Sequence, residues 1–154
     1  MFCIAASILC VSRPHAARIF VGVFFIIMAV GVNVVLTVLA PDQFIRLGDE
    51  PLLPFYGWVF QNVFAPAPHI VGILAAAGEI GIGLLILSRG RSVKLGLAGA
   101  IAFLIVITPL GIWTLPNPVL AGGLAWLLKE EYPRSVLDLL RSRRHRKVTK
   151  GTAI

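Results

Sequence analysis

Residues 70–88 read IVGILAAAGEIGIGLLILS, a run of 19 residues in which Glu79 is the only charged side chain. A run of this length reaches the roughly 20 residues that an α-helix needs to cross the hydrocarbon core of a bilayer. A carboxyl group at that depth is costly, so by default it is a functional candidate that faces other helices rather than lipid. The run therefore predicts a membrane-spanning helix with one candidate site residue near its centre.

Three further apolar stretches accompany this run. Residues 19–40 and 95–115 are each long enough to span the membrane. Residues 116–129 also span if Lys129 extends its ammonium group to the interface or the bilayer thins locally. The sequence thus predicts an all-α protein, a transmembrane four-helix bundle.

The composition agrees with a membrane location. Of the 154 residues, 58% are hydrophobic and only 14% are charged, with a mean hydropathy of +0.91. Soluble domains carry about 25% charged residues, so this chain is not expected to be a soluble globule. The net charge of +7 does not indicate nucleic-acid binding, because the basic residues flank apolar spans and line no groove with interleaved aromatics.

The basic residues also predict the orientation. With four spans, 13 of the 14 basic residues fall on one side of the membrane and Arg46 alone falls on the other. The positive-inside rule then puts both termini in the cytoplasm, in the cytoplasmic (inner) membrane of a bacterium.

The chain divides into three parts on this basis. Residues 1–17 form an N-terminal cytoplasmic or interfacial segment, residues 18–130 the transmembrane domain, and residues 131–154 a basic cytoplasmic tail. We expect the tail to lie on anionic lipid headgroups, or to dock an acidic cytoplasmic protein.

The connection over residues 41–69 is rich in aromatic residues and fenced by prolines. It is too short and polar to cross the membrane, so we expect an interfacial or re-entrant element on the outer face. One interpretation is a lid that only packs on the bundle. The other is a mouth for an amphipathic ligand, with His69, Tyr56 and Trp58 as its candidate residues.

Two stripes of small and polar residues predict which faces meet. At helical spacing one stripe of the second span and one face of the first combine such residues. They are Gly72, Ala76, Glu79 and Gly83 in the second span, and Gly22, Ala29, Asn33 and Thr37 in the first. Small residues let helices approach closely, so both stripes should be interfaces.

Depth along the spans then predicts a buried polar cluster. Glu79 lies roughly 15 Å from the outer edge, and Asn33 and Thr108 lie roughly 10 Å from it, at 1.5 Å rise per residue. We expect Glu79 to contact both, with Pro109 freeing the carbonyl of Ile105 to join them. Without a cation nearby, burial favours a protonated carboxyl, which donates one hydrogen bond and accepts another. Such a cluster acts either as helix–helix glue or as a site for a proton or a ligand such as a quinone.

No other chemistry is indicated. The histidines lie at unmatched depths, and the cysteines, Cys3 and Cys10, form no C-x-x-C pair, so we expect no metal site, haem or thioredoxin-like centre. The chain has no motif for covalent catalysis, so no catalytic residue is assigned.

The pattern resembles the DoxX-like family of small membrane proteins. The matching features are the four spans with both ends inside, the opening ARIFVGVFF at residues 17–25, and EIGIGLLIL at residues 79–87. Members are named after a subunit associated with thiosulfate:quinone oxidoreductase. The resemblance implies a quinone-linked or assembly role in which Glu79 is the position that carries over. The chain departs from the family in carrying Asn33 and Val34 where a basic residue often stands, and in its longer outer loop.

Three functional hypotheses follow. The leading one is an accessory subunit of a membrane redox or envelope complex, without catalytic activity of its own and with quinone as its candidate cofactor. The alternative is a small proton-coupled exporter in which Glu79 binds cation and proton in turn. Four-span exporters usually function as dimers, so a homo-oligomer is among the expected partners. The third is an enzyme acting on a lipid or quinone.

Overall fold

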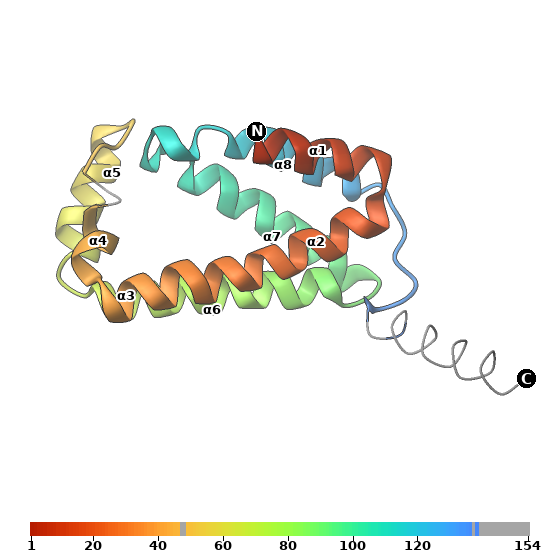
Figure 1. Cartoon of the computed structure of the whole chain (residues 1–154), viewed down its shortest axis with the longest axis horizontal. Helices are drawn as coiled ribbons and strands as arrows, with labels where there is room; N and C mark the ends of the chain where they lie inside the picture. The colour runs from red at the N-terminus through yellow and green to blue at the C-terminus, as the bar shows by residue number, and fades with distance from the viewer. Residues whose placement is uncertain (47–48, 137, 139–154) are drawn as a thin grey trace, which may run out of the picture.

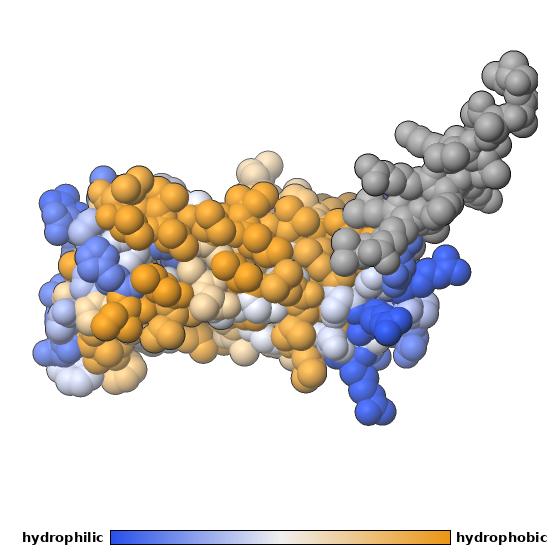
Figure 2. Space-filling model, turned by 90° about the horizontal axis from the view of Figure 1, so that it is seen from below, coloured by the Kyte–Doolittle hydropathy of each residue, from blue (hydrophilic) through white to orange (hydrophobic). Residues whose placement is uncertain are grey.

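The computed structural model describes residues 1–46, 49–136 and 138, and within these ranges the regular structure is helical, with no strand. Three helical stretches are long and apolar enough to cross a membrane: Pro14–Leu39, Pro68–Leu87 and Arg91–Leu110. On the face shown in Figure 2, apolar side chains cover the length of the molecule and hydrophilic ones gather toward its two ends. The protein is therefore all-helical, with helices of the length and hydrophobicity found in membrane proteins.

The first long stretch is one continuous helix with a wider turn inside it. It comprises α2 (Pro14–Met28), the π-helical segment η1 (Ala29–Val34) and α3 (Val35–Leu39). It packs along the full length of α6 (Pro68–Leu87), as Figure 1 shows. The π turn falls in the half of this helix that lies farther from Pro14, where the predicted Asn33 stands.

Glycines set the spacing between the long helices. A Cβ atom added to Gly83 would lie 2.8 Å from the backbone oxygen of Gly22, so α2 and α6 meet almost backbone to backbone. One added to Gly96 in α7 (Arg91–Ile107) would lie 2.7 Å from the backbone nitrogen of Ile86 in α6. The predicted interfacial stripe of α6 is confirmed, because Gly72, Ala76, Glu79 and Gly83 are all buried.

The apolar core lies at the end of the bundle where α1 (Phe2–Ser12) and α8 (Asn117–Leu127) pack on the long helices. Its fully buried side chains come from all five of these helices. They include Cys10, Val21, Ile86, Leu97, Leu124 and Leu127.

The helix predicted over residues 116–129 is shorter than a full span. After α7 the chain forms two 3-10 turns, η3 (Thr108–Leu110) and η4 (Ile112–Thr114), before α8 begins. The 11 residues of α8 cover about 16 Å, roughly half the thickness of a hydrocarbon core. The prolines at 109, 116 and 118 lack an N–H and interrupt a longer helix. The chain nevertheless returns to the start of α7, where the Gly90 N–H donates to the Tyr132 carbonyl at 2.8 Å.

The first residues form a helix that sequence reasoning did not foresee. Ala6 and Cys10 of α1 are buried, and Ser7 Oγ donates to the Val119 carbonyl of α8 at 2.9 Å. A Cβ atom added to Gly123 would lie 2.8 Å from Ser7 Cα, so the two short helices are in close contact. The segment is thus held along the bundle; whether it lies at the membrane surface stays a prediction.

The predicted outer element lies across one end of the bundle (Figure 1). It contains α4 (Pro41–Arg46), α5 (Pro54–Val59) and the π-helical η2 (Phe60–Phe64). The Leu52 N–H donates to the Pro109 carbonyl at 2.9 Å, which ties the element to η3. The element therefore covers the bundle end. Most of the basic tail predicted at the opposite end lies outside the described residues.

Candidate functional site

Glu79 and Asn33 form the central polar pair of the bundle. Glu79 is buried in the middle of α6, with 6% of its surface exposed. Asn33 Nδ2 donates a hydrogen bond to Glu79 Oε2 at 2.8 Å. The predicted contact between these two residues is thus confirmed, and it joins the first and second long helices.

Asn33 lies within the π turn of the first long helix. The N–H of Val35 donates to the carbonyl of Val30, five residues back, which is the hydrogen bond of a π-helix. A π turn inserts one extra residue into a helix, and such turns occur often at functional sites. Here the turn contains the polar residue that contacts the buried carboxyl.

Thr37 and Gly72 hold the helices together one turn beyond this pair. The Thr37 hydroxyl donates to the carbonyl of Asn33, and its side chain is fully buried. A Cβ atom on Gly72 would overlap that side chain, lying 2.7 Å from Thr37 Cγ2. The glycine therefore lets the helices approach closely just beyond the Asn33–Glu79 contact.

The pair borders an apolar cavity of about 420 Å³. Small-molecule sites are usually apolar cavities of roughly 300–1,000 Å³ with a few polar groups that fix orientation. In this cavity the polar side chains are Asn33, Glu79 and Thr114, and the remaining wall is apolar. The arrangement suits an apolar molecule with one or two hydrogen-bonding atoms.

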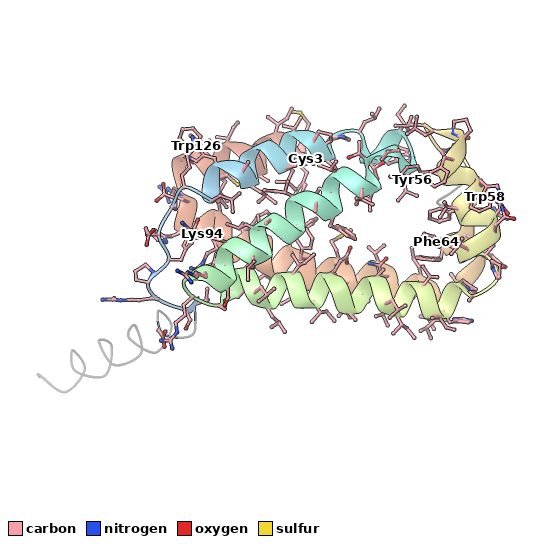
Figure 3. The ribbon with its side chains drawn as sticks, turned by 180° about the vertical axis from the view of Figure 1, so that it is seen from behind. Cys3, Tyr56, Trp58, Phe64, Lys94 and Trp126 are labelled. Carbon is pink, nitrogen blue, oxygen red and sulfur yellow. The ribbon has the colours of Figure 1, made fainter. Side chains whose placement is uncertain are left out.

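Three phenylalanines from the outer element line the end of the cavity that lies away from the core. Phe44 of α4 and Phe60 of η2 are 5% and 4% exposed, although both belong to short connecting helices. The rings of Phe60 and Phe64 meet edge to face with centroids 4.6 Å apart. Figure 3 shows Phe64 pointing from η2 toward the long helices and Trp58 pointing away from them. The outer element thus contributes an aromatic wall.

Thr108 does not join the polar pair, contrary to our prediction. Its hydroxyl donates to the Leu104 carbonyl at 2.6 Å, and its N–H donates to Ile105, the carbonyl we expected to be free. The helix tightens into a 3-10 turn before Pro109, so that carbonyl keeps a partner. Thr114 lines the cavity instead, with its hydroxyl 2.7 Å from the Gly111 carbonyl.

The residues predicted for an outer mouth stand outside the cavity wall. Tyr56 donates its hydroxyl to the Val106 carbonyl at 2.7 Å, which fixes α5 to α7. Trp58 is 59% exposed and stacks on Phe55, and His69 is exposed at the start of α6. Tyr56 therefore has a structural contact, while a ligand role for Trp58 or His69 stays a prediction.

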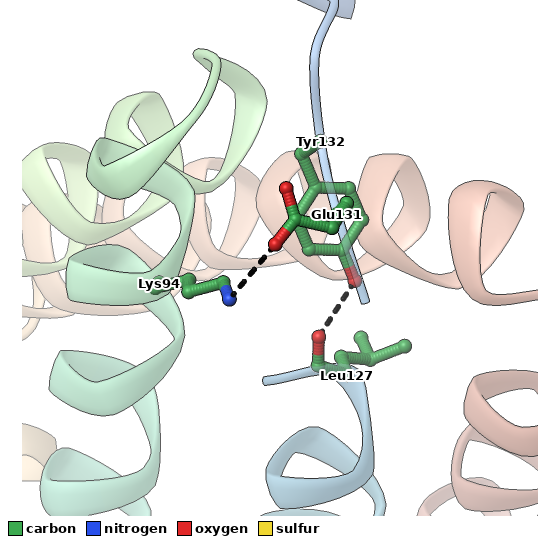
Figure 4. A network of polar contacts seen from close by, with 4 residues as sticks. All are labelled: Lys94, Leu127, Glu131 and Tyr132. Atoms are coloured by element: carbon green, nitrogen blue, oxygen red, sulfur yellow. Dashed lines mark hydrogen bonds and ion pairs between the residues drawn. The ribbon is translucent and has the colours of Figure 1, made fainter. Parts of the chain in front are cut away.

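A second polar cluster, at the opposite end, was not foreseen. Arg18 is one of the basic residues that flank the apolar spans, and it is 1% exposed. Its guanidinium carbon lies 4.8 Å from the centre of the Tyr132 ring, and Nη2 donates to the Arg134 carbonyl at 3.3 Å. The Tyr132 hydroxyl donates to the Leu127 carbonyl at 2.9 Å (Figure 4). Burial raises the pKa of Tyr132 to about 12.

Metal binding finds no support in the described ranges. Within them, no three His, Cys, Asp or Glu side chains come together as a metal site would require. Comparison with protein-family models, curated proteins and solved structures finds no match for this chain. The chemistry of the site must therefore be read from its own residues.

Proposed function

We propose that this chain is a four-span protein of a bacterial inner membrane, with both termini in the cytoplasm, that binds a quinone-type ligand next to Glu79. Its role would be that of an accessory subunit of a membrane redox or envelope complex, of the DoxX-like kind. The three long apolar helices support the membrane location. The return of the chain to the start of α7 supports an even number of crossings, because residue 132 contacts residue 90.

The observation that carries the ligand proposal is the contact of the Asn33–Glu79 pair with an apolar cavity. A quinone head group is a flat apolar ring with carbonyl acceptors. A protonated Glu79 donates to such a carbonyl through one oxygen while the other accepts from Asn33 Nδ2. Phe60, Phe64 and Phe103 offer ring faces and edges for packing against the ligand. The long tail of a quinone would extend into the surrounding lipid.

The test separates ligand binding from helix–helix glue. The purified protein and its variants are extracted for bound quinone and then titrated with a short-chain quinone. We expect Glu79→Leu to weaken binding about tenfold or more, because removing one partner of a buried hydrogen bond costs about 1–3 kcal/mol. Glu79→Gln keeps a donor and should retain most of the affinity.

Thr108→Val is the matched control. Thr108 was a sequence candidate, but its hydroxyl is engaged within its own helix and does not line the cavity. This variant should bind quinone as the wild type does. If Glu79→Leu also binds normally while only its expression falls, the pair is structural and the ligand proposal is wrong.

The exporter hypothesis depends on the same carboxyl and predicts a different phenotype. An exporter that exchanges protons for a cationic drug needs an ionisable group, so Glu79→Gln would abolish resistance in a drug-efflux assay. Under the quinone proposal the same variant leaves drug resistance unchanged. The one measurement therefore distinguishes the two functions.

A further inference from the structure

A second pocket lies at the end of the bundle opposite the aromatic wall. Its volume is about 330 Å³. The residues around it come from the turn before α7, the first turn of α7 and the chain that follows α8: Gly90, Arg91, Lys94, Glu131, Tyr132 and Pro133. The Gly90–Tyr132 hydrogen bond at 2.8 Å joins the two segments. The wall of this pocket is therefore a fixed arrangement of backbone with charged side chains on it.

The charged side chains of the pocket are mainly basic. Arg91 and Lys94 lie three residues apart on α7 and face the same side. Glu131 is the only acid among the wall residues that the structure describes, and its ion pair with Lys94 has an N–O distance of 3.7 Å (Figure 4). The Glu131 side chain is 91% exposed and the Lys94 side chain 43%. Exposed pairs of this kind contribute little, so a stronger anion can replace Glu131 as the partner of Lys94.

The backbone adds to this positive character. α7 begins at Arg91 after Gly90, which provides no side-chain cap, and its first turn carries no acidic residue. The first N–H groups of a helix have no acceptor within the helix, and the helix dipole favours an anion there. Phosphate groups bind at helix N-termini for these reasons.

Arg18 is a buried cation that does not line the pocket but lies against one of its wall residues. Its guanidinium packs on Tyr132, which is part of the pocket wall, and it is 1% exposed. Among the described residues it has no carboxylate partner, and its Nε has no hydrogen-bond partner. A buried cation without a counter-charge is costly, and an anion in the adjacent pocket would reduce that cost.

We propose that this pocket binds a phosphate group, presented by an anionic phospholipid headgroup or by free phosphate in solution. In this site the phosphate oxygens accept from the side chains of Arg91 and Lys94 and from the first two N–H groups of α7, since the third, that of Val93, donates to the Gly90 carbonyl. The pocket lies at the start of α7, at one end of the long helices, and hydrophilic side chains gather toward the ends of the molecule (Figure 2). Basic pockets at that level, on the cytoplasmic side, are known to hold lipid headgroups. This site is separate from the predicted role of the basic tail.

The test measures lipid adducts on the full-length protein by native mass spectrometry in detergent. Phosphatidylglycerol, which is anionic, is titrated beside phosphatidylcholine, which has no net charge. We expect Arg91→Gln and Lys94→Gln each to weaken phosphatidylglycerol binding about fivefold. This is about the factor in affinity that one basic residue near a membrane surface contributes to the binding of an anionic lipid. Glu131→Gln removes the competing acid and should strengthen it.

Arg13→Gln is the matched control. Arg13 is exposed at the turn between α1 and α2 and does not line the pocket, so its loss removes the same charge without touching the site. Phosphatidylglycerol binding should then be unchanged. If Arg13→Gln weakens binding as much as Arg91→Gln does, the attraction is diffuse and no pocket is involved.

A second arm distinguishes the source of the phosphate. Inorganic phosphate is added alone to the detergent-solubilised protein, and thermal stability is recorded for the wild type and for Arg91→Gln. A headgroup site shows a preference for phosphatidylglycerol and little response to inorganic phosphate. A free-phosphate site shows stabilisation that depends on Arg91 and no preference between the lipids. If neither ligand distinguishes the wild type from Arg91→Gln, the proposal is wrong.

Discussion

Replacing Gly72 with alanine places a methyl group against a side chain that has no room to move. The added Cβ atom would overlap the Thr37 hydroxyl and lie 2.7 Å from Thr37 Cγ2 and 2.8 Å from Thr37 Cβ. Thr37 is fully buried, and its hydroxyl is engaged with the Asn33 carbonyl. Relief requires α3 and α6 to separate or Thr37 to lose that hydrogen bond. Either change disturbs the helix turn that contains Asn33.

A second glycine of the same helix makes this effect measurable. Gly78 is exposed, and an added Cβ atom would have no neighbour within 4 Å. Both Gly→Ala changes gain about 1 kcal/mol of helix propensity. Only Gly72→Ala adds the cost of overpacking, about 1–3 kcal/mol. Gly78→Ala should therefore exceed Gly72→Ala in unfolding free energy by about 1–3 kcal/mol.

The assay is unfolding in mixed micelles of dodecyl maltoside and dodecyl sulfate, followed by circular dichroism. The difference between the two variants cancels the shared propensity term, so it reports the packing alone. A further variant, Gly72→Ala with Thr37→Ala, removes the overlapping hydroxyl and Cγ2 and should recover part of the loss. If Gly72→Ala and Gly78→Ala have equal stability, the close approach of α3 and α6 is not present in the protein.

Three further predictions concern the other contacts. In a double-mutant cycle of Asn33→Leu and Glu79→Leu, we expect a coupling energy of about 0.6–2 kcal/mol in the same unfolding assay, and a value near zero would contradict the hydrogen bond. Gly90 has φ +61° and ψ −134°, a conformation that costs other residues about 1–3 kcal/mol, so Gly90→Ala should destabilise the protein. Gly122→Ala is the control and should not, because a Cβ atom there has open space around it. The raised pKa of Tyr132, about 12 when folded against about 10 when unfolded, means that the unfolded state loses its proton first. The contribution of the Tyr132 hydroxyl to stability is therefore complete below pH 10 and is lost as pH rises toward 12. The measurement is the difference in unfolding free energy between wild type and Tyr132→Phe over that pH range. A difference that stays constant would show that the hydroxyl is not buried.

The sequence predicted the long helices and the buried face of α6 because both follow from simple regularities. Apolar length marks a span, and the spacing of Gly72, Ala76, Glu79 and Gly83 marks one side of a helix. The Asn33–Glu79 contact followed from depth together with the facing stripes of small and polar residues. These predictions needed no knowledge of the loops.

Other features depend on details that a pattern of residue types does not encode. The prediction for Thr108 assumed that the carbonyl of Ile105 would be left free before Pro109, whereas a 3-10 turn satisfied it within the helix. The prediction for residues 116–129 depended on Lys129 or on a thinner bilayer to complete the span, whereas α8 extends only over Asn117–Leu127. The burial of Arg18 depends on where Tyr132 returns, more than a hundred residues later, and no local signal marks it. The sequence showed that residues 41–69 are rich in aromatic side chains. It did not show which of these rings point into the cavity.

The wide turn at residues 29–34 has a consequence for recognising related chains. Each residue of an α-helix advances the side-chain direction by about 100°, so an added residue would rotate everything after it unless a wider turn takes up the extra residue. Gly22 and Thr37 both face α6 across this insertion, each from its own side of it. A relative without the insertion would match this chain only if one position were skipped between residues 29 and 34.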